Sequence, residues 1–184
     1  MYDNLFYTCL EADLPIPPAW EEAGWRLLHS DDGKMCQLDR NRGWQVWMGN
    51  GPDEEHDMAY GAARMHGKCL VLGLGIGLVV QYINACKKCK SITIVERSPI
   101  VIKHIAPWLQ ENVSIPIEII EGDDVEFLSS TEQKWNTMYA DTWEKCTDAL
   151  HKIDTLRKLA IGKVKGKKVF WCEQELKCLK KEGR

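Results

Sequence analysis

Three glycines at alternate positions, set between two apolar segments, constrain this 184-residue chain more than any other feature. Residues 68–83 read KCLVLGLGIGLVVQYI, with Gly73, Gly75 and Gly77 in the middle. Two interpretations are open: a buried β-hairpin, or a strand followed by a nucleotide-sized turn and a helix. Glycine permits positive φ and lets a ligand approach the backbone without a Cβ in the way, so the downstream pattern has to decide.

Beyond residue 68, short apolar runs alternate with longer amphipathic segments. The pattern predicts strands at residues 69–72, 91–95, 117–120, 137–140 and 168–172. It predicts helices at residues 78–86, 100–111, 125–129 and 145–160, the second interrupted or ended near Pro107. Strict alternation favours right-handed crossovers, so we expect an α/β fold with a Rossmann-like, doubly wound, mostly parallel sheet.

The first 66 residues have a different pattern. Three prolines at residues 14–20 favour an extended segment, and residues 34–38 and 43–48 favour a pair of strands. Pro52 begins a segment with an acidic first turn, which predicts a helix that ends near Gly67. We therefore expect an N-terminal extension over residues 1–66, with a β-hairpin and a helix, before a nucleotide-binding domain over residues 67–184.

Candidate ligand-binding residues follow four predicted strands. In an open parallel sheet, ligands bind beyond the carboxyl ends of the strands. The glycine loop follows the first strand, Glu96 ends the second, Asp123 follows the third and Asp141 follows the fourth. Glu96 lies nineteen residues after Gly77, a spacing at which a carboxylate can accept both hydroxyl protons of a ribose.

The glycine spacing also helps to choose the ligand. A dinucleotide fingerprint is G-x-G-x-x-G, whereas this chain has G-x-G-x-G. With that loop the chain resembles the class I S-adenosylmethionine-dependent methyltransferases, and within them the spermidine synthase-like branch. The segments VLGLGIG, IVERSPIV, EGDDVEFL and YADTW occur in that family's order, and residues 36–67 look like its small hairpin and acidic helix.

The resemblance implies S-adenosylmethionine as the cofactor and assigns its contacts. The backbone of Gly73 to Gly77 would hold the methionine part, Glu96 the ribose hydroxyls and Asp123 the adenine amino group. Asp141 would lie beside the transferred group, as a cofactor contact and as the candidate catalytic residue. The resulting cofactor set is Gly73, Leu74, Gly75, Gly77, Glu96, Arg97, Asp123, Asp124 and Asp141.

Each of these residues has a plainer alternative. The glycine loop can be a tight strand-to-helix turn, and Glu96 a solvated carboxylate at a strand end. Asp123 and Asp124 can cap the helix that begins near residue 125. Asp141 can be a helix cap, a ligand for the amino group of the cofactor, or a general base.

The identity of the methyl acceptor is constrained mainly by sequence motifs that the chain lacks. Aminopropyl transfer in the resembling family needs further acidic residues after the fourth strand, where this chain has TWEK. It also lacks the motifs of DNA-base methyltransferases at that position. We therefore expect an enzyme that methylates a small molecule and not nucleic acid, with Trp143 as a wall of the substrate pocket. The alternatives are an aminopropyltransferase-like enzyme and a non-catalytic cofactor-binding module.

Composition and length complete the expectations. Eight cysteines are scattered, and Cys86 and Cys89 lack the second pair that a structural zinc site needs, so we expect ordinary free thiols and no metal. No apolar run is long enough to span a bilayer, which predicts a cytoplasmic protein without a membrane contact. Because the chain ends about ten residues after the fifth strand, one sheet edge stays open unless N-terminal strands or the second subunit of a homodimer cover it.

Overall fold

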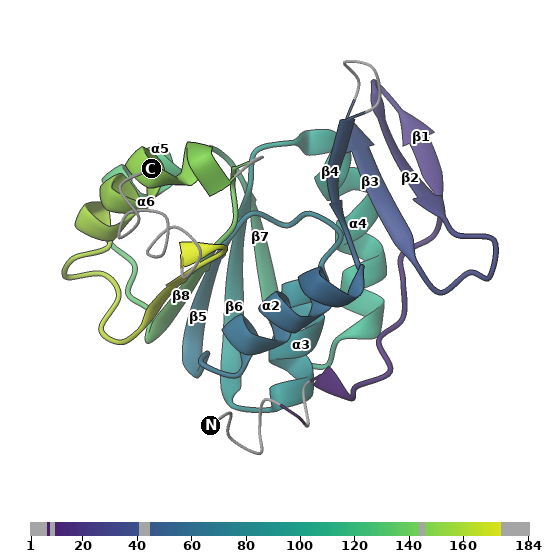
Figure 1. Ribbon diagram of the computed structural model, residues 1–184. Coiled ribbons are helices and arrows are strands. Elements are labelled where there is room, and N and C mark those ends of the chain that lie inside the picture. Colours follow the sequence, from purple (N-terminus) through teal and green to yellow (C-terminus); the bar gives the residue numbers. More distant parts are fainter. Residues whose placement is uncertain (1–6, 8–9, 41–44, 144–145, 174–184) are drawn as a thin grey trace, which may run out of the picture.

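A computed structural model describes residues 7, 10–40, 45–143 and 146–173, which form helices and two β-sheets (Figure 1). A five-stranded parallel sheet has the order β7-β6-β5-β8-β9, and a four-stranded antiparallel sheet has the order β1-β2-β3-β4. The fold class predicted from the sequence, a Rossmann-like parallel sheet with an N-terminal β extension, is confirmed.

The parallel sheet is built from βα units. Its strands are β5 (Gly67–Leu72), β6 (Cys89–Glu96), β7 (Ile117–Glu121), β8 (Thr137–Ala140) and β9 (Lys168–Phe170). Its crossover helices are α3 (Leu78–Cys86), α4 (Pro99–Asn112), α5 (Asp124–Ser130) and α6 (Cys146–Leu159). From β5 the chain first builds outward through β6 to β7, and then returns to add β8 and β9 on the other side. The strand order therefore reverses between β5 and β8, where open α/β sheets bind ligands.

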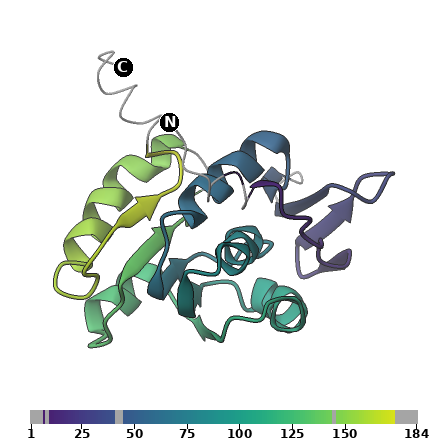
Figure 2. The ribbon, with the colours of Figure 1, turned by 90° about the horizontal axis from the view of Figure 1, so that it is seen from below.

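Helices cover both faces of this sheet, as the view from below shows (Figure 2). Side chains of β5 alternate between the two cores: Cys69 and Val71 pack with α3 and α4, and Leu70 and Leu72 pack with α6. All four are fully buried. A strand that is apolar on both faces reads as a continuous apolar run, which explains why residues 69–72 show no alternation.

Two predicted helix ends differ from the structure. Helix α4 continues through Pro107 to Asn112, so the predicted interruption is wrong. Pro107 is exposed, and the carbonyl of Lys103, which loses its helical donor there, lies on the side of the helix that water reaches. Helix α2 (Pro52–Ala62) ends earlier than predicted, and Gly67 instead begins β5 with a φ of 69°.

The N-terminal sheet is larger than the predicted hairpin. The expected pair is present as β3 (Cys36–Arg40) and β4 (Gln45–Gly49), and two strands that the sequence did not predict, β1 (Trp20–Glu22) and β2 (Trp25–His29), extend it. In β2 only Leu27 is buried, while Leu28 beside it is 41% exposed. One buried residue gives no periodic signal, so β2 escaped prediction.

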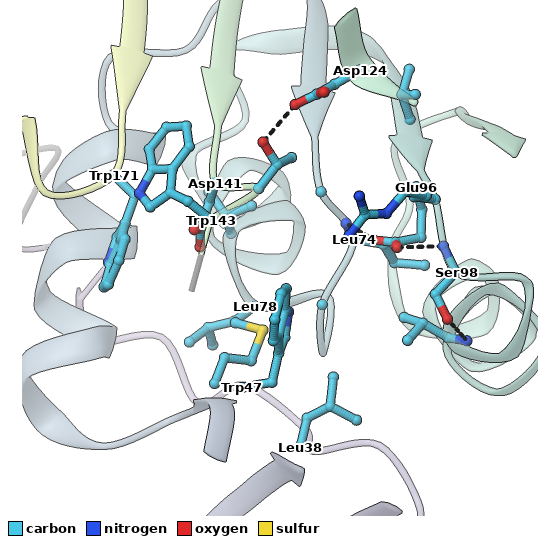
Figure 3. A pocket seen from close by; sticks show the side chains of 18 of the residues that line it. Leu38, Trp47, Leu74, Leu78, Glu96, Ser98, Asp124, Asp141, Trp143 and Trp171 are labelled. Atoms are coloured by element: carbon cyan, nitrogen blue, oxygen red, sulfur yellow. Dashed lines mark hydrogen bonds between the residues drawn. The ribbon is translucent and has the colours of Figure 1, made fainter. Parts of the chain in front are cut away.

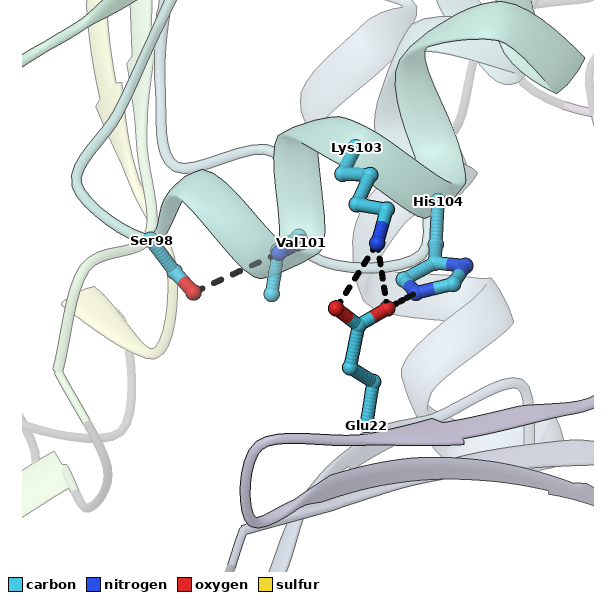
Figure 4. A network of polar contacts seen from close by, with 5 residues as sticks. All are labelled: Glu22, Ser98, Val101, Lys103 and His104. Carbon is cyan, nitrogen blue, oxygen red and sulfur yellow. Dashed lines mark hydrogen bonds and ion pairs between the residues drawn. The ribbon is translucent and has the colours of Figure 1, made fainter.

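The N-terminal sheet packs on the helical layer that contains α2, α3 and α4. Leu27 and Leu38 belong to the same buried core as α2 and α3. A polar contact adds to this packing (Figure 4): both carboxylate oxygens of Glu22 lie 2.7 Å from Nζ of Lys103, and one lies 2.8 Å from Nε2 of His104. Because of these two partners, the pKa of Glu22 is lowered.

The edges of the parallel sheet, in the part of the chain that the structure describes, are β7 and β9. The N-terminal strands form their own sheet and pair with neither edge. The boundary between residues 66 and 67 and the homodimer stay predictions. Among the described residues, no helix has the length and apolar character that crossing a membrane requires.

Candidate functional site

A cavity of about 310 Å³ lies at the carboxyl ends of the parallel strands, against the N-terminal sheet (Figure 3). One part of its lining follows β5, β6 and β7, and we call it the cofactor half. Its residues are Gly73, Leu74, Gly75, Glu96, Arg97, Ser98, Asp123 and Asp124. The other part, the acceptor half, comes from the N-terminal sheet, α2, β8 and the segment after β9. Its residues include Trp25, Arg40, Trp47, Met48, Glu54, Met58, Tyr139, Asp141, Trp143 and Trp171.

The glycine loop has backbone conformations and close contacts that only glycine tolerates. Gly73 has a φ of 94°, and a Cβ there would lie 2.1 Å from the carbonyl oxygen of Asp141. Gly75 has a φ of 51°, and its Cβ would lie 2.1 Å from Sδ of Met48. The atoms that approach these two glycines therefore belong to the protein itself. Through these contacts the glycine loop packs against the residue that follows β8 and against Met48 of the N-terminal sheet.

Gly77 differs from the other two loop glycines. It is the N-cap of α3, and a Cβ on it would meet Leu109 of α4 at 3.1 Å. It is absent from the pocket lining. The structure thus brings Gly73, Leu74 and Gly75 to the pocket but leaves Gly77 in the packing between α3 and α4.

Glu96 is fixed against the glycine loop. Its Oε2 accepts a hydrogen bond of 2.8 Å from the backbone N–H of Leu74, and its Oε1 accepts one of 2.8 Å from Ser98 N–H (Figure 3). Each carboxylate oxygen can accept a second hydrogen bond, so both oxygens keep the capacity to bind ribose hydroxyls. Glu96 is therefore an organised acceptor, and Arg97 lies exposed beside it at the pocket.

Asp123 and Asp124 have different surroundings. Oδ1 of Asp123 accepts hydrogen bonds from Val125 N–H (2.9 Å) and Glu126 N–H (3.2 Å), so the alternative of a helix cap is confirmed for Asp123. Asp124 is 4% exposed. Its Oδ2 accepts from the hydroxyl of Thr142 at 2.5 Å and pairs with Nζ of Lys152 at 3.0 Å.

The second oxygen of Asp124, Oδ1, is buried and has no hydrogen-bond partner in the described part of the chain. Leaving a buried acceptor unsatisfied costs about 1–3 kcal/mol. Because Asp124 lines the pocket, a ligand that donates a hydrogen bond at this oxygen would remove that cost.

Two carboxyl groups of the acceptor half have raised pKa values. Burial, followed by repulsion from Glu54 and Glu96, raises the pKa of Asp141 well above its usual value. Burial, followed by repulsion from Asp57, raises the pKa of Glu54 to about 7. Neither carboxylate forms an ion pair among the described residues. This part of the pocket therefore favours a bound cation.

Glu54 is a pocket residue that the sequence did not reveal. Sequence reasoning explained it as part of the acidic first turn of a helix, and it does lie in the first turn of α2. No spacing rule connects it to Asp141, because the two are brought together only by packing of α2 beside β8. There the hydroxyl of Tyr139 donates to Sδ of Met58 at 3.0 Å.

Two tryptophans stand beside these carboxyl groups. Trp143, predicted as a pocket wall, does line the pocket, is 6% exposed, and stacks on Phe170 with ring centroids 6.5 Å apart. Trp171 also lines the pocket. Their indole Nε1 atoms are buried without a hydrogen-bond acceptor among the described residues.

The N-terminal sheet supplies an aromatic wall that sequence reasoning missed. Trp25 and Trp47 contact each other edge to face, with centroids 5.8 Å apart. The guanidinium of Arg40 lies 5.2 Å from the ring of Trp25 and 5.6 Å from that of Trp47. The tryptophans of the N-terminal segment are visible in the sequence, but no sequence pattern indicates that their side chains lie near the glycine loop.

The cysteines need one correction. Cys36, Cys69 and Cys89 are free, whereas Cys86 is disulfide-bonded, so the prediction of an ordinary thiol is wrong for Cys86. Within the described ranges, no three His, Cys, Asp or Glu side chains gather in a way that would hold a metal ion.

Comparisons with known proteins give similarity to solved structures alone. No model of a known protein family matches the chain, and no curated protein does. Among solved structures, the N-methyltransferase NodS from Bradyrhizobium japonicum matches with 13% identity and a TM-score of 0.49, over 63% of this chain and 65% of NodS. The SAH-bound methyltransferase PaMTH1 from Podospora anserina matches with 16% identity and a TM-score of 0.47, over 63% and 48%.

Spermidine synthase from Thermotoga maritima matches over more of this chain, 82%, and over 53% of its own length, with 9% identity and a TM-score of 0.44. The chain thus spans about half to two thirds of the length of these structures. These are similarities of fold, and they do not single out the spermidine synthase branch.

Proposed function

We propose that this protein is an S-adenosylmethionine-dependent methyltransferase that acts on a small molecule. One observation carries the proposal: Glu96 is hydrogen-bonded to the glycine loop, and the same pocket is lined by Asp124, whose buried Oδ1 has no hydrogen-bond partner among the described residues. An adenosine needs two kinds of partner, acceptors for its ribose hydroxyls and an acceptor for its exocyclic amine. The two carboxylates match those needs from neighbouring strand ends.

Roles follow for the residues of the cofactor half. Glu96 would accept the ribose hydroxyls with the lone pairs that Leu74 and Ser98 leave free. Asp124 would accept the adenine amine at Oδ1, while its Oδ2 pairs with Nζ of Lys152. Asp123, already engaged as a helix cap through Oδ1, keeps Oδ2 for the same base. S-adenosylmethionine, when bound, supplies a methyl group activated by its sulfonium.

The acceptor half favours a small amine as the methyl acceptor. Asp141 and Glu54 have no cationic partner among the residues that the structure describes, and a protonated amine would supply the missing positive charge. Trp143 and Trp171 offer aromatic faces, which attract a cation at about 6 Å. An amine must lose a proton to become a nucleophile, and Asp141 is placed to hold that proton. The enclosed pocket would align the amine nitrogen and exclude water.

A second candidate is an aminopropyltransferase-like reaction. Sequence reasoning disfavoured it because TWEK follows the fourth strand without the expected acidic residues. Glu54 supplies a carboxyl group from α2 instead, which restores part of that acidic environment. Consumption of decarboxylated S-adenosylmethionine together with a diamine would separate this reaction from methyl transfer. A non-catalytic module would bind the cofactor tightly and turn over no acceptor.

Ligand binding tests the proposal directly. Thermal stability is measured with S-adenosylmethionine, S-adenosylhomocysteine, methylthioadenosine, NAD and ATP, because a ligand that binds only the native state raises the melting temperature. We expect the first three to stabilise. The proposal is overturned if they have no effect and NAD stabilises.

Glu96→Ala tests the site itself. We expect the variant to bind S-adenosylhomocysteine at least about tenfold more weakly, because each charged hydrogen bond contributes about 1.5–3 kcal/mol. Glu121→Ala is the matched control: Glu121 pairs with Glu96 in the register of β6 and β7, and it is exposed and outside the pocket. Equal affinity of both variants and the parent protein would remove the ribose role.

A further inference from the structure

A pair of thiols lies at the amino end of the parallel sheet, away from the pocket. Sγ of Cys69 in β5 lies 2.9 Å from Sγ of Cys89, the first residue of β6, and both cysteines are free. Neither residue lines the pocket. Two thiols at this separation are close enough that a disulfide needs only a small approach of the sulfur atoms.

A β-bulge brings the two side chains together. In the parallel pair, Gly67 lies opposite Cys89, whereas Lys68 lies opposite Ser91, so one extra residue is inserted in β6. Bulges of this kind re-aim neighbouring side chains. In the resulting register Cys69 lies opposite Ile92, and the proximity of the two sulfurs has no counterpart in the sequence spacing.

The surroundings of the pair differ between the two sulfurs. Cys69 is fully buried, and its Sγ also lies 3.3 Å from the hydroxyl of Thr137. The hydrogen bond between the two sulfurs lowers the pKa of Cys69 and raises that of Cys89. Cys89 is half-buried, so a dissolved oxidant reaches it first.

We propose that Cys69 and Cys89 form a reversible dithiol–disulfide pair that cross-links β5 to β6. With glutathione disulfide as oxidant, the Cys89 sulfur attacks one sulfur of that disulfide, the S–S bond breaks, and one glutathione thiol leaves with the Cys89 proton. Cys69 then gives its proton to water and attacks Cys89 Sγ as a thiolate, and the second glutathione leaves as a thiolate that takes a proton from the solvent. The two cysteines are oxidised by two electrons, and glutathione disulfide is reduced to two thiols.

The cross-link closes the segment 69–89, which contains the glycine loop and all of α3. The cross-link between Cys69 and Cys89 lies toward the amino ends of the strands, and the pocket lies at their carboxyl ends. Oxidation therefore restrains the unit that holds the glycine loop without contacting the pocket. A disulfide that restricts the unfolded chain over a loop of this length raises the melting temperature by roughly 5–10 °C.

The test titrates the intact native protein with glutathione disulfide, quenches with acid, blocks remaining thiols and maps tryptic peptides by mass spectrometry. Cleavage after Lys68 and Lys87 leaves Cys69 and Cys86 on one peptide and Cys89 on another. We expect these two peptides to become linked, with fragment ions that assign the link to Cys69. Cys36→Ser is the control, because Cys36 is another buried free thiol, in the N-terminal sheet.

The outcomes separate the alternatives. The link should form in the parent protein and in Cys36→Ser, disappear in Cys69→Ser and Cys89→Ser, and reverse with reduced glutathione. A link that persists in Cys69→Ser would show exchange with Cys86 and overturn the proposal. So would absence of any link in parent protein that circular dichroism shows to be folded. Since the readout involves no cofactor, it is independent of the proposed function.

Discussion

The cofactor half and the acceptor half of the pocket are built in opposite ways. The cofactor half comes from successive βα units, and each contributes the residues that directly follow its strand. The acceptor half draws on the N-terminal sheet, α2, the end of β8 and Trp171, which are distant in the sequence. The residues of a site can therefore be predicted from the sequence where the sheet topology alone brings them together.

The halves also differ in how their carboxylates are satisfied. Glu96 accepts two backbone N–H bonds, Asp123 caps a helix, and Asp124 pairs with Lys152. In the acceptor half, the pKa values of Glu54 and Asp141 are raised because burial and like charges oppose ionisation. The cofactor half is thus preorganised by protein contacts, and the acceptor half is left to be neutralised by protons or by a cationic ligand.

The largest effect is expected for Gly73→Ala. The new Cβ would meet the carbonyl oxygen of Asp141 at 2.1 Å, at a φ of 94°, so backbone on both halves would have to move. We expect the free energy of unfolding to fall by about 3 kcal/mol or more, measured by urea denaturation.

Gly122→Ala is the matched control for this substitution. Gly122 also lines the pocket, but a Cβ there meets nothing within 4 Å. We expect a change within about 1 kcal/mol. Equal losses in the free energy of unfolding for the two variants would contradict the view that close packing of Gly73 holds the glycine loop against the end of β8.

A pH-dependent effect is expected for Glu54→Gln. The folded pKa of Glu54, about 7, exceeds its usual 4.5, so the folded state binds the proton more tightly. The contribution of Glu54 to the stability of the unliganded protein is therefore highest in acid and declines by about 2–3 kcal/mol as the pH rises from about 4.5 to about 7. Glu54→Gln should flatten this decline, as measured by melting temperature against pH.

Asp53→Asn is the control for Glu54→Gln, because Asp53 is an exposed neighbour in the same helical turn and outside the pocket. It should keep the decline. Affinity for S-adenosylhomocysteine should stay within about twofold in both variants, since neither changes the cofactor half. A parallel loss of cofactor affinity in Glu54→Gln would show that the two halves are not separable.

Trp47→Ala probes the aromatic wall. Trp47 is half-buried and contacts Trp25 and Arg40, so we expect a loss of about 1–2 kcal/mol in stability, less than for a fully buried tryptophan. Cofactor affinity should change little, and KM for the acceptor should rise, measured in an activity assay with the identified acceptor. An increase in cofactor Kd as large as that in acceptor KM would place this wall in both halves.

The smallest effect is expected for Glu22→Gln. The contacts of Glu22 with Lys103 and His104 lower its pKa below the usual 4.5, so their stabilisation is present above that value and declines as the pH falls through the lowered pKa. The parent protein should lose this contribution on acidification, and Glu22→Gln should lack it at every pH. Melting curves between pH 3 and 7 would detect the difference, and identical profiles would show that the contact does not hold the N-terminal sheet.

The sequence by itself determined the order of strands and helices from β5 to β9, the positions of Gly73, Glu96, Asp123 and Asp141 at or after the ends of their strands, and hence the edge of the sheet where the pocket lies. It could do so because parallel strands end at one edge of a sheet, so residues that follow strands meet there whatever their separation. The ends of α4 and α2 were predicted wrongly. Helix α4 continues through Pro107 because this proline lies on the exposed side of the helix, and α2 ends in a turn before Gly67.

Only the tertiary structure decided which residues face that pocket from the other side. Glu54, Trp25, Arg40 and Trp47 reach it because the N-terminal sheet and α2 pack on the helical layer, and no local period encodes the angle of that packing. The same holds for Cys69 and Cys89, which meet through a bulge. Contacts between separately formed elements depend on shape and volume at their interface, and these properties are absent from any short stretch of sequence.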